Sequence, residues 1–221
     1  VKLDIVIEGK IIKYFKHFRL QQSIRKHHTF ELTLAHDALG DGQDHNLEEA
    51  QQFLGKRLTV VFKYKDAENE SPERTFVGFI TQVAFSQEKA SLGSIVLKGK
   101  SPTILMDSAP HTQSFGGDQQ VNTSIIADRV IKETLGSGKY DFKIDTKNKS
   151  YINYSAQYKE THYNYLARLA ETYGEQFYYD GEVLHFGKLP PGEQPIKLTY
   201  GSNVSDICIE LKAVHTKPEF F

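Results

Sequence analysis

The chain has 221 residues, of which 39% are hydrophobic and 25% charged, a composition typical of a globular protein with a sizeable core. Its formal net charge of -1 gives no overall attraction to nucleic acid or to an anionic membrane surface. Cys208 is the only cysteine, which excludes an intramolecular disulfide framework and a cysteine-rich structural zinc site.

The N-terminal segment VKLDIVIEGK alternates charged and apolar residues and lacks the apolar core of a signal peptide. No apolar run in the sequence approaches the length of a transmembrane helix. These patterns predict a protein that folds in the cytoplasm and has no membrane anchor.

Most of the first hundred residues have the two-residue alternation of half-buried β-strands. The five segments with this pattern are 3–9, 28–35, 57–65, 74–86 and 93–101. One helix is predicted between them, over NLEEAQQFL, with Asn46 as the N-cap, Gly55 just past the end, and Leu47, Ala50 and Leu54 on one face. Strands around a single short helix favour a closed or half-closed β-barrel.

The middle of the chain changes character. Residues 101–120 contain two prolines and a glycine pair, which indicates a connection between modules. A helix is predicted after this connection, capped by Asn122 or Thr123 and ended by Gly136. Its expected apolar stripe consists of Ile126, Val130 and Ile131.

The most strongly patterned segment is QYKETHYNYLARLAETYGEQFYYDG, residues 157–181. Thr161 is expected to cap a helix that ends at Tyr173, with Gly174 as the residue after it. The predicted buried stripe of this helix consists of Tyr165, Leu166, Leu169, Ala170 and Tyr173.

A β-hairpin is predicted directly after this helix. Asp180-Gly181 is the pair expected to form a type I′ turn between two short strands. Two further strands are predicted over 195–201 and 205–214.

The sequence contains no motif that carries catalysis. Gly99-Lys100-Ser101 has the end of a phosphate-binding loop but lacks its first glycine, so a β-turn is the preferred interpretation. His27 and His28 are interpreted as decoration of a strand edge. A loop over 36–45 gathers histidines and aspartates without the spacing of a known metal site, and a solvated polar loop is preferred. We expect no catalytic residue, no cofactor and no metal ion.

Segment 157–181 resembles the signature of the VgrG and phage late-control D family, the hub and spike proteins of type VI secretion systems and contractile phage tails. Tyr165 stands where the family usually has phenylalanine. Segments 76–86, 97–115 and 121–133 resemble other family segments in the same order, over most of residues 1–190. The positions that meet the signature are Gln157, Tyr158, Glu160, Leu166, Arg168, Leu169, Glu171, Gly174, Tyr178 and Tyr179.

This resemblance implies a mainly β fold with α+β insertions, built from β-barrel modules and assembled as a homotrimer through the hub and the spike. It implies a hexameric tube protein as a partner, possible effectors or adaptors, and expulsion into a target cell on contraction. Complete family members continue into a further barrel and a β-helical spike, so this chain corresponds to the hub.

The domain organisation expected on this basis has three parts. Residues 1–105 form a first β-barrel module, 106–140 a connecting segment with a helix, and 141–221 an α+β module that leads into a second, incomplete barrel. Three functions remain open: a non-enzymatic hub of a secretion system, phage or tailocin, a carbohydrate- or ligand-binding barrel that uses the aromatic hairpin, and a hydrolase.

Overall fold

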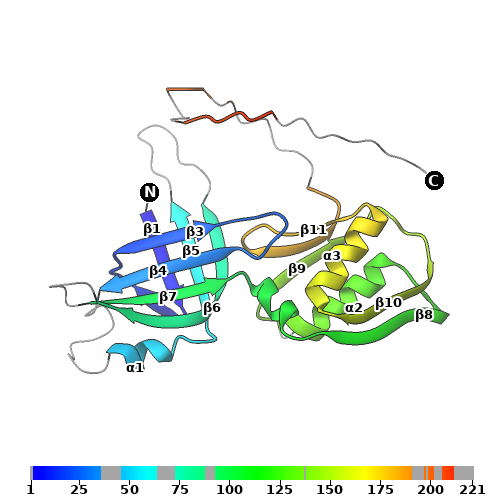
Figure 1. Cartoon of the computed structure of the whole chain (residues 1–221), viewed down its shortest axis with the longest axis horizontal. Helices are drawn as coiled ribbons and strands as arrows, with labels where there is room; N and C mark the ends of the chain where they lie inside the picture. Colours follow the sequence, from blue (N-terminus) through cyan, green and yellow to red (C-terminus); the bar gives the residue numbers. More distant parts are fainter. Residues whose placement is uncertain are drawn as a thin grey trace. The chain divides into compact units, whose positions relative to one another are not determined.

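The computed structural model describes residues 2–35, 46–63, 73–87, 93–136, 138–190, 197, 199–201 and 206–211 (Figure 1). The chain divides into two compact units, Val1–Lys188 and Leu189–Phe221. No helix in these described ranges is long and apolar enough to cross a membrane.

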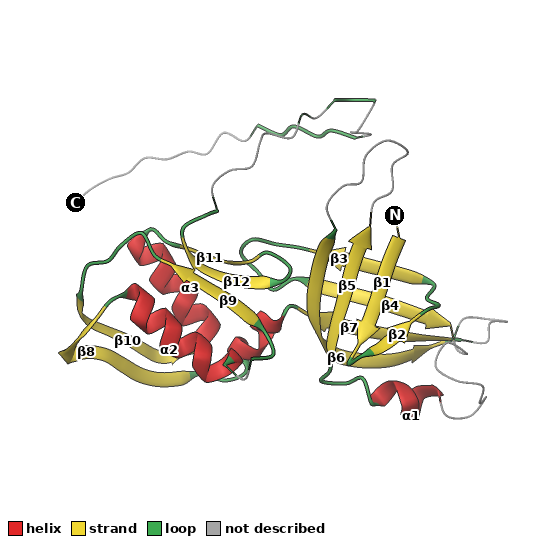
Figure 2. Cartoon of the chain, turned by 180° about the vertical axis from the view of Figure 1, so that it is seen from behind, coloured by secondary structure: helices red, strands yellow, loops and turns green. Residues whose placement is uncertain are grey.

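The first unit begins with a seven-stranded sheet in which all neighbouring strands are antiparallel, in the order β2-β1-β5-β6-β7-β4-β3. The sheet curls around its own core as a half-closed barrel (Figure 2). Its strands are β1 Lys2–Ile7, β2 Lys10–Ile12, β3 His17–Gln21, β4 Thr29–Ala35, β5 Arg57–Lys63, β6 Arg74–Ser86 and β7 Ser94–Lys100.

The five strands predicted in this region are confirmed as β1, β4, β5, β6 and β7. In β4 the alternation is complete, since Phe30, Leu32 and Leu34 are buried while the residues between them remain partly exposed. Period-two alternation places every second side chain on the core face, which is why the sequence pattern is informative here. The sequence did not predict β2 and β3, which are short.

The helix α1, Asn46–Gln51, is shorter than predicted. Ala50 is fully buried as expected. The placement of Leu54 on the buried face is wrong, since Leu54 is 52% exposed. The helix ends at Gln51 and a turn follows, so the helical period no longer applies and Phe53 enters the core instead. The side chain of Leu47 lies outside the described residues.

The rest of this unit is an α/β segment, residues 102–187. Its helices α2 and α3 pack against each other, against the two-stranded sheet β10-β8 and against the three-stranded sheet β11-β12-β9 (Figures 1 and 2). The pair β12-β9 is parallel. The elements are η1 Pro102–Asp107, β8 His111–Val121, α2 Thr123–Leu135, β9 Asp141–Asp145, β10 Ile152–Glu160, α3 His162–Tyr173, β11 Gln176–Tyr179 and β12 Val183–Gly187.

Residues 101–120, interpreted from the sequence as a connection between modules, have regular secondary structure: η1 followed by the start of β8. The second half of this range belongs to the strand β8, which pairs with β10 from Ile152 to Glu160. Only Phe115 and Val121 of β8 are buried, so the strand has no alternation of apolar and polar residue types for the sequence to reveal. Its backbone hydrogen bonds to β10 define it instead.

The helix α2 matches its prediction. The Asn122 side chain accepts a hydrogen bond from the Ile125 N–H at 3.0 Å, and the helix ends at Gly136. All three residues of the expected stripe are buried: Ile126, Val130 and Ile131.

The second unit differs from its prediction. Residues 206–211, which lie inside the predicted strand 205–214, form no strand. The apolar members of that alternation are exposed, with Ile209 at 84% and Leu211 at 95%. Alternation produces a strand only when a neighbouring strand covers one of its faces, and the exposure of these side chains shows that neither face is covered by the described residues. Of the predicted strand 195–201, only four residues are described, and none of them belongs to one of the strands named above.

Candidate functional site

The family signature centres on α3 and the strands on either side of it. Thr161 caps the helix, since its hydroxyl accepts a hydrogen bond from the Asn164 N–H at 3.2 Å. Gly174 ends the helix in the left-handed conformation (φ 66°) and donates to the last carbonyl groups. Both caps are as predicted. Leu166 and Leu169 are buried, whereas Glu171 is exposed on the other face.

Glu160 and Arg168 join α3 to the end of β10. The Arg168 guanidinium donates to both carboxylate oxygens of Glu160 and, at 2.8 Å, to the carbonyl of Ala156. It also lies over the Tyr165 ring, 5.3 Å from the centroid. The hydrogen bond that Arg168 donates to Glu160 raises the pKa of Arg168. Because half of the Arg168 side chain is exposed, the pair fixes geometry and adds little stability.

Gln157 is the most thoroughly buried polar residue of the signature, with no exposed surface. Its amide nitrogen donates to the carbonyl of Glu160 at 2.8 Å, and its oxygen accepts from the Gln113 amide at 2.7 Å. The turn it closes is tight, since Lys159 has a positive φ of 50°. Gln157 therefore sets the path of the chain from β10 into α3. The next signature residue, Tyr158, is 67% exposed.

The β11-β12 hairpin is confirmed, but its turn is not the predicted type I′. Asp180 pairs with Val183 through a backbone hydrogen bond of 3.1 Å, so Gly181 and Glu182 are the central residues. Of these two, only Gly181 has a positive φ. The Asp180 carboxylate accepts hydrogen bonds from the N–H groups of Glu182 and Val183, which fixes this side chain against the turn.

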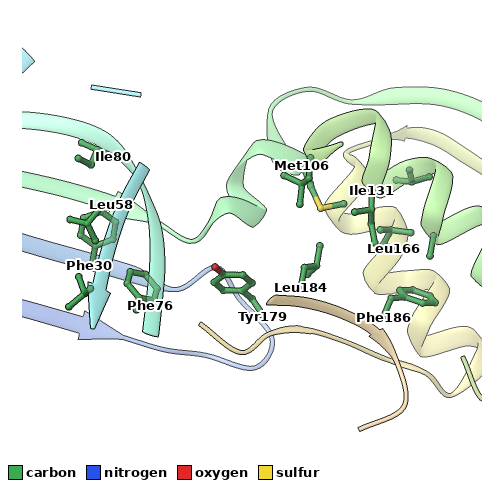
Figure 3. Close-up of a cluster of buried hydrophobic side chains, with 14 of the residues drawn as sticks. Phe30, Leu58, Phe76, Ile80, Met106, Ile131, Leu166, Tyr179, Leu184 and Phe186 are labelled. Carbon is green, nitrogen blue, oxygen red and sulfur yellow. The ribbon is translucent and has the colours of Figure 1, made fainter. Parts of the chain in front are cut away.

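This hairpin joins the α/β segment to the seven-stranded sheet. The Val77 N–H donates to the Gly181 carbonyl at 2.7 Å, and the Tyr179 hydroxyl donates to the Val77 carbonyl at 3.1 Å. Burial raises the pKa of Tyr179, so the phenol keeps the proton that it donates. Figure 3 shows Tyr179 between the core side chains of the sheet, such as Phe76, and those of the α/β segment, such as Leu184.

Tyr178 and Tyr179 provide a matched test of this joint. Tyr179→Phe removes a buried hydrogen bond and is expected to lower the free energy of unfolding by about 0.5–1.5 kcal/mol. Tyr178→Phe removes a hydroxyl that is buried without a partner among the described residues, so it is expected to be neutral or stabilising. Urea denaturation of both variants measures the difference. A greater loss for Tyr178→Phe would contradict the assigned hydrogen bonds.

The interpretation of His27 and His28 as edge decoration is wrong, because the His28 ring is buried and only 13% of the His27 side chain is exposed. His28 is 2% exposed, its Nε2–H donates to the Ser23 carbonyl at 3.1 Å, and its ring stacks on Phe76. His27 is bonded on both ring nitrogens, to Asp107 at 3.3 Å and to the Thr103 hydroxyl at 2.8 Å. These contacts tie the sheet to η1.

The chain of hydrogen bonds from Asp107 through His27 to Thr103 has the order of a hydrolase triad. Thr103 is only 2% exposed, and its hydroxyl lies 2.7 Å from that of Ser101, which is fully buried. Ser101 in turn accepts the His28 N–H at 3.0 Å. The hydroxyls are therefore used within the core and are closed to a substrate. The phosphate-loop and β-turn interpretations of Gly99-Lys100-Ser101 also fail, because Gly99 and Lys100 lie in β7.

Buried neutral histidines predict a pH dependence of stability. Desolvation lowers the pKa of His27 and of His28 below the usual value of about 6.5. Below that pH the unfolded chain binds more protons than the folded one, so stability falls as pH falls toward the folded-state pKa values. We expect a lower urea midpoint at about pH 5.5 than at about pH 7.5.

The control for this prediction is a change at the exposed His17. His17→Ala should leave the difference between the two midpoints unchanged, whereas His28→Asn should reduce it. Equal midpoints at both pH values in the unmodified chain would contradict the prediction.

A cluster of two histidines and a glutamate was not predicted from the sequence. His111 at the start of β8, Glu133 on α2 and His162 at the start of α3 each offer one ligand atom, and these atoms all lie within 4.8 Å of one another. Three separate elements supply them, so no local spacing in the sequence could indicate the cluster. The histidine- and aspartate-rich loop over 36–45 lies outside the described residues.

Surface hollows bear on the ligand-binding alternative. One of about 370 Å³ lies over β3, β4, β6 and β7 and is lined by Arg19, Glu31, Lys98 and Lys100 among others. Another, of about 730 Å³, lies on α2 and β9. Neither is lined by the hairpin tyrosines on which that alternative depends.

Comparisons with known proteins agree with this architecture. The chain is similar in structure to a 43 kDa tail protein of prophage MuSo2 from Shewanella oneidensis, with a TM-score of 0.66 and 17% identity over 92% of this chain and 58% of that one. It is also similar to an E. coli component of the type VI secretion system that is described as similar to the T4 bacteriophage tail proteins gp27 and gp5, with a TM-score of 0.59 and 16% identity over 83% of this chain and 48% of that one.

A third similar structure is the Francisella PdpA-VgrG complex, with a TM-score of 0.53 and 11% identity over 86% of this chain and 31% of that one. At these identities the likeness shows the fold, and the chain spans about half the length of the first two structures. A search of curated proteins gave no significant match. The sequence model of the phage tail baseplate hub (GPD) matches residues 21–196, which is most of the chain. The chain therefore belongs to the phage tail baseplate hub (GPD) family.

Proposed function

We propose that this chain is the structural hub at the base of the cell-puncturing spike of a type VI secretion system or related contractile injection system. The family match over residues 21–196 carries this proposal. The hub joins the tube to the spike and performs no catalysis. The side chains that could resemble a hydrolase site, Thr103 and Ser101, are buried and used within the core, which supports this view.

The assembly that we propose is a homotrimer that contacts a hexameric tube protein and carries effectors or adaptors. Two related barrels in each protomer would give the trimer six similar surfaces for that tube. In this scheme residues 1–105 are the first barrel module, 106–140 the connection with its helix, and 141–221 the α+β module that leads into the second barrel. The complex assembles in the cytoplasm and is expelled into a target on contraction.

Light scattering tests the assembly. A version of the chain extended through a spike domain should have three times the mass of one protomer, whereas the 221-residue chain alone should be a monomer or a mixture of monomer and trimer. A stable dimer of the extended protein would overturn the proposal, and so would hydrolysis of peptidoglycan or an ester by this chain that one carboxylate substitution abolishes.

A phage or tailocin baseplate hub is the second candidate. The specific observation in its favour is the likeness to a prophage tail protein, which has the higher TM-score of the first two structures described above. Electron microscopy of particles that co-purify with a tagged copy separates the candidates. Complete phage or tailocin particles would favour the phage or tailocin hub. Sheaths recovered from inside cells, together with secretion into neighbouring cells, would favour the secretion-system hub.

A further inference from the structure

The cluster of His111, Glu133 and His162 brings together two imidazoles and a carboxylate from three different elements. The His162 Nε2 lies 3.6 Å from a Glu133 carboxylate oxygen, and the His111 and His162 rings are stacked with their centroids 3.9 Å apart. His162 is 3% exposed, whereas nearly half of the Glu133 side chain is open to solvent. The group is therefore anchored in the interior and reachable from outside.

Gln157 determines which nitrogen of His162 carries a proton. The His162 Nδ1 lies 3.1 Å from the Gln157 side-chain oxygen. The orientation of that amide is fixed, since its nitrogen donates to the Glu160 carbonyl and its oxygen accepts from the Gln113 amide. A carbonyl oxygen can only accept, so Nδ1 must be the protonated nitrogen. In neutral His162 the lone pair on Nε2 then points toward the Glu133 carboxylate.

Two electron-pair donors thus face each other with no proton between them. Such an arrangement is repulsive unless a cation lies between the two groups. Metal-binding histidines have this same arrangement, with one ring N–H held by a carbonyl and the other nitrogen free to coordinate. We propose that His111, Glu133 and His162 form a binding site for a divalent transition-metal ion of the zinc class.

The donor set determines the class of ion. Two imidazole nitrogens and one carboxylate oxygen suit Zn²⁺ and its neighbours in the first transition row and are a poor match for Ca²⁺ or Mg²⁺, which prefer oxygen ligands. Three protein ligands leave one tetrahedral position for water. Stacked rings hold their nitrogens side by side, so binding draws the half-buried His111 ring out of the stack toward the ion. The ion would tie the start of β8 to α2 and α3 and so brace the α/β segment.

The experiment is zinc titration by calorimetry on the untagged full chain that carries Cys208→Ser, because an exposed thiol such as that of Cys208 can bind zinc by itself. One zinc ion should bind per chain and raise the thermal midpoint. His111→Ala and Glu133→Gln should each weaken zinc binding by about tenfold or more. Loss of a residue that only hydrogen-bonds to a metal ligand already has an effect of about this size, and loss of a ligand itself should have at least the same effect. Co²⁺ should give the visible absorption of a tetrahedral site in the parent and lose it in both variants.

Matched controls are His17→Ala, which removes an exposed histidine elsewhere, and Glu171→Gln, which neutralises an exposed carboxylate on α3. Both should bind zinc as the parent does. Glu133→Gln has the same shape as the original residue on an exposed helix position, so its folding is not in question if His111→Ala proves unstable. No binding by the parent, or unchanged affinity in Glu133→Gln, would overturn the proposal.

Discussion

Leu169→Ala is expected to lower the free energy of unfolding by about 2–5 kcal/mol. Leu169 is 2% exposed and lies on α3 beside the fully buried Leu166, where this helix packs against α2 and the sheets on either side. Removing three carbons there loses the transfer free energy of those carbons and leaves a cavity that close packing cannot fill. Urea denaturation followed by circular dichroism measures the loss.

Glu171→Ala is the control on the same helix. Glu171 is exposed two residues further along, and a change at such a surface position is usually worth within about 0.5 kcal/mol. Its midpoint should therefore stay close to that of the parent while the midpoint of Leu169→Ala falls. Equal losses from the two changes would mean that the apolar stripe of α3 does not face the core.

The sequence predicted those elements whose cause is local. The caps of α3 at Thr161 and Gly174 depend on single residues with particular hydrogen-bonding or backbone properties, and both are present in the structure. The alternation of β4 depends on its burial on one face, which the residues themselves display. Five strands of the seven-stranded sheet and the helices α2 and α3 belong to this group.

What the sequence missed depends on contacts between distant residues. The strand β8 is polar and exists because β10 pairs with it, although the paired residues Gln113 and Gln157 are 44 positions apart. The joint between the hairpin and the sheet depends on Tyr179 and Val77, which are 102 positions apart. The alternating residues 206–211 show the converse case, in which the local pattern is right for a strand but the apolar side chains are exposed and no strand forms.

The candidate site divides along the same line. The signature from Gln157 to Tyr179 could be identified in the sequence, but the role of each of its residues is known only from the structure. Gln157 closes the turn and orients His162, Arg168 bridges to Glu160, and Leu169 fills the core. The His111, Glu133 and His162 cluster had no sequence signal, because its members are brought together by tertiary packing from β8, α2 and α3.

Gly187→Ala is expected to lower the free energy of unfolding by about 2–6 kcal/mol, the combined cost of backbone strain and overpacking. Gly187 ends β12 with a φ of 131°, a conformation that side-chain-bearing residues rarely adopt. A Cβ atom there would overlap the backbone carbonyl of Asp145 on the parallel strand β9. That carbonyl accepts the Lys188 N–H at 2.7 Å, so it cannot move away without losing a hydrogen bond.

Gly138→Ala separates the two contributions. Gly138 also has a positive φ, 71°, but a Cβ atom there would meet nothing within 4 Å. Its replacement should cost only the strain of the left-handed conformation, about 1–2 kcal/mol. The parallel strands β9 and β12 approach each other closely where Gly187 pairs with Asp145. We therefore expect Gly187→Ala, unlike Gly138→Ala, to weaken the amide-exchange protection along both strands. If thermal unfolding gave the two glycine variants the same midpoint, the close contact between Gly187 and Asp145 would not be what holds these strands together.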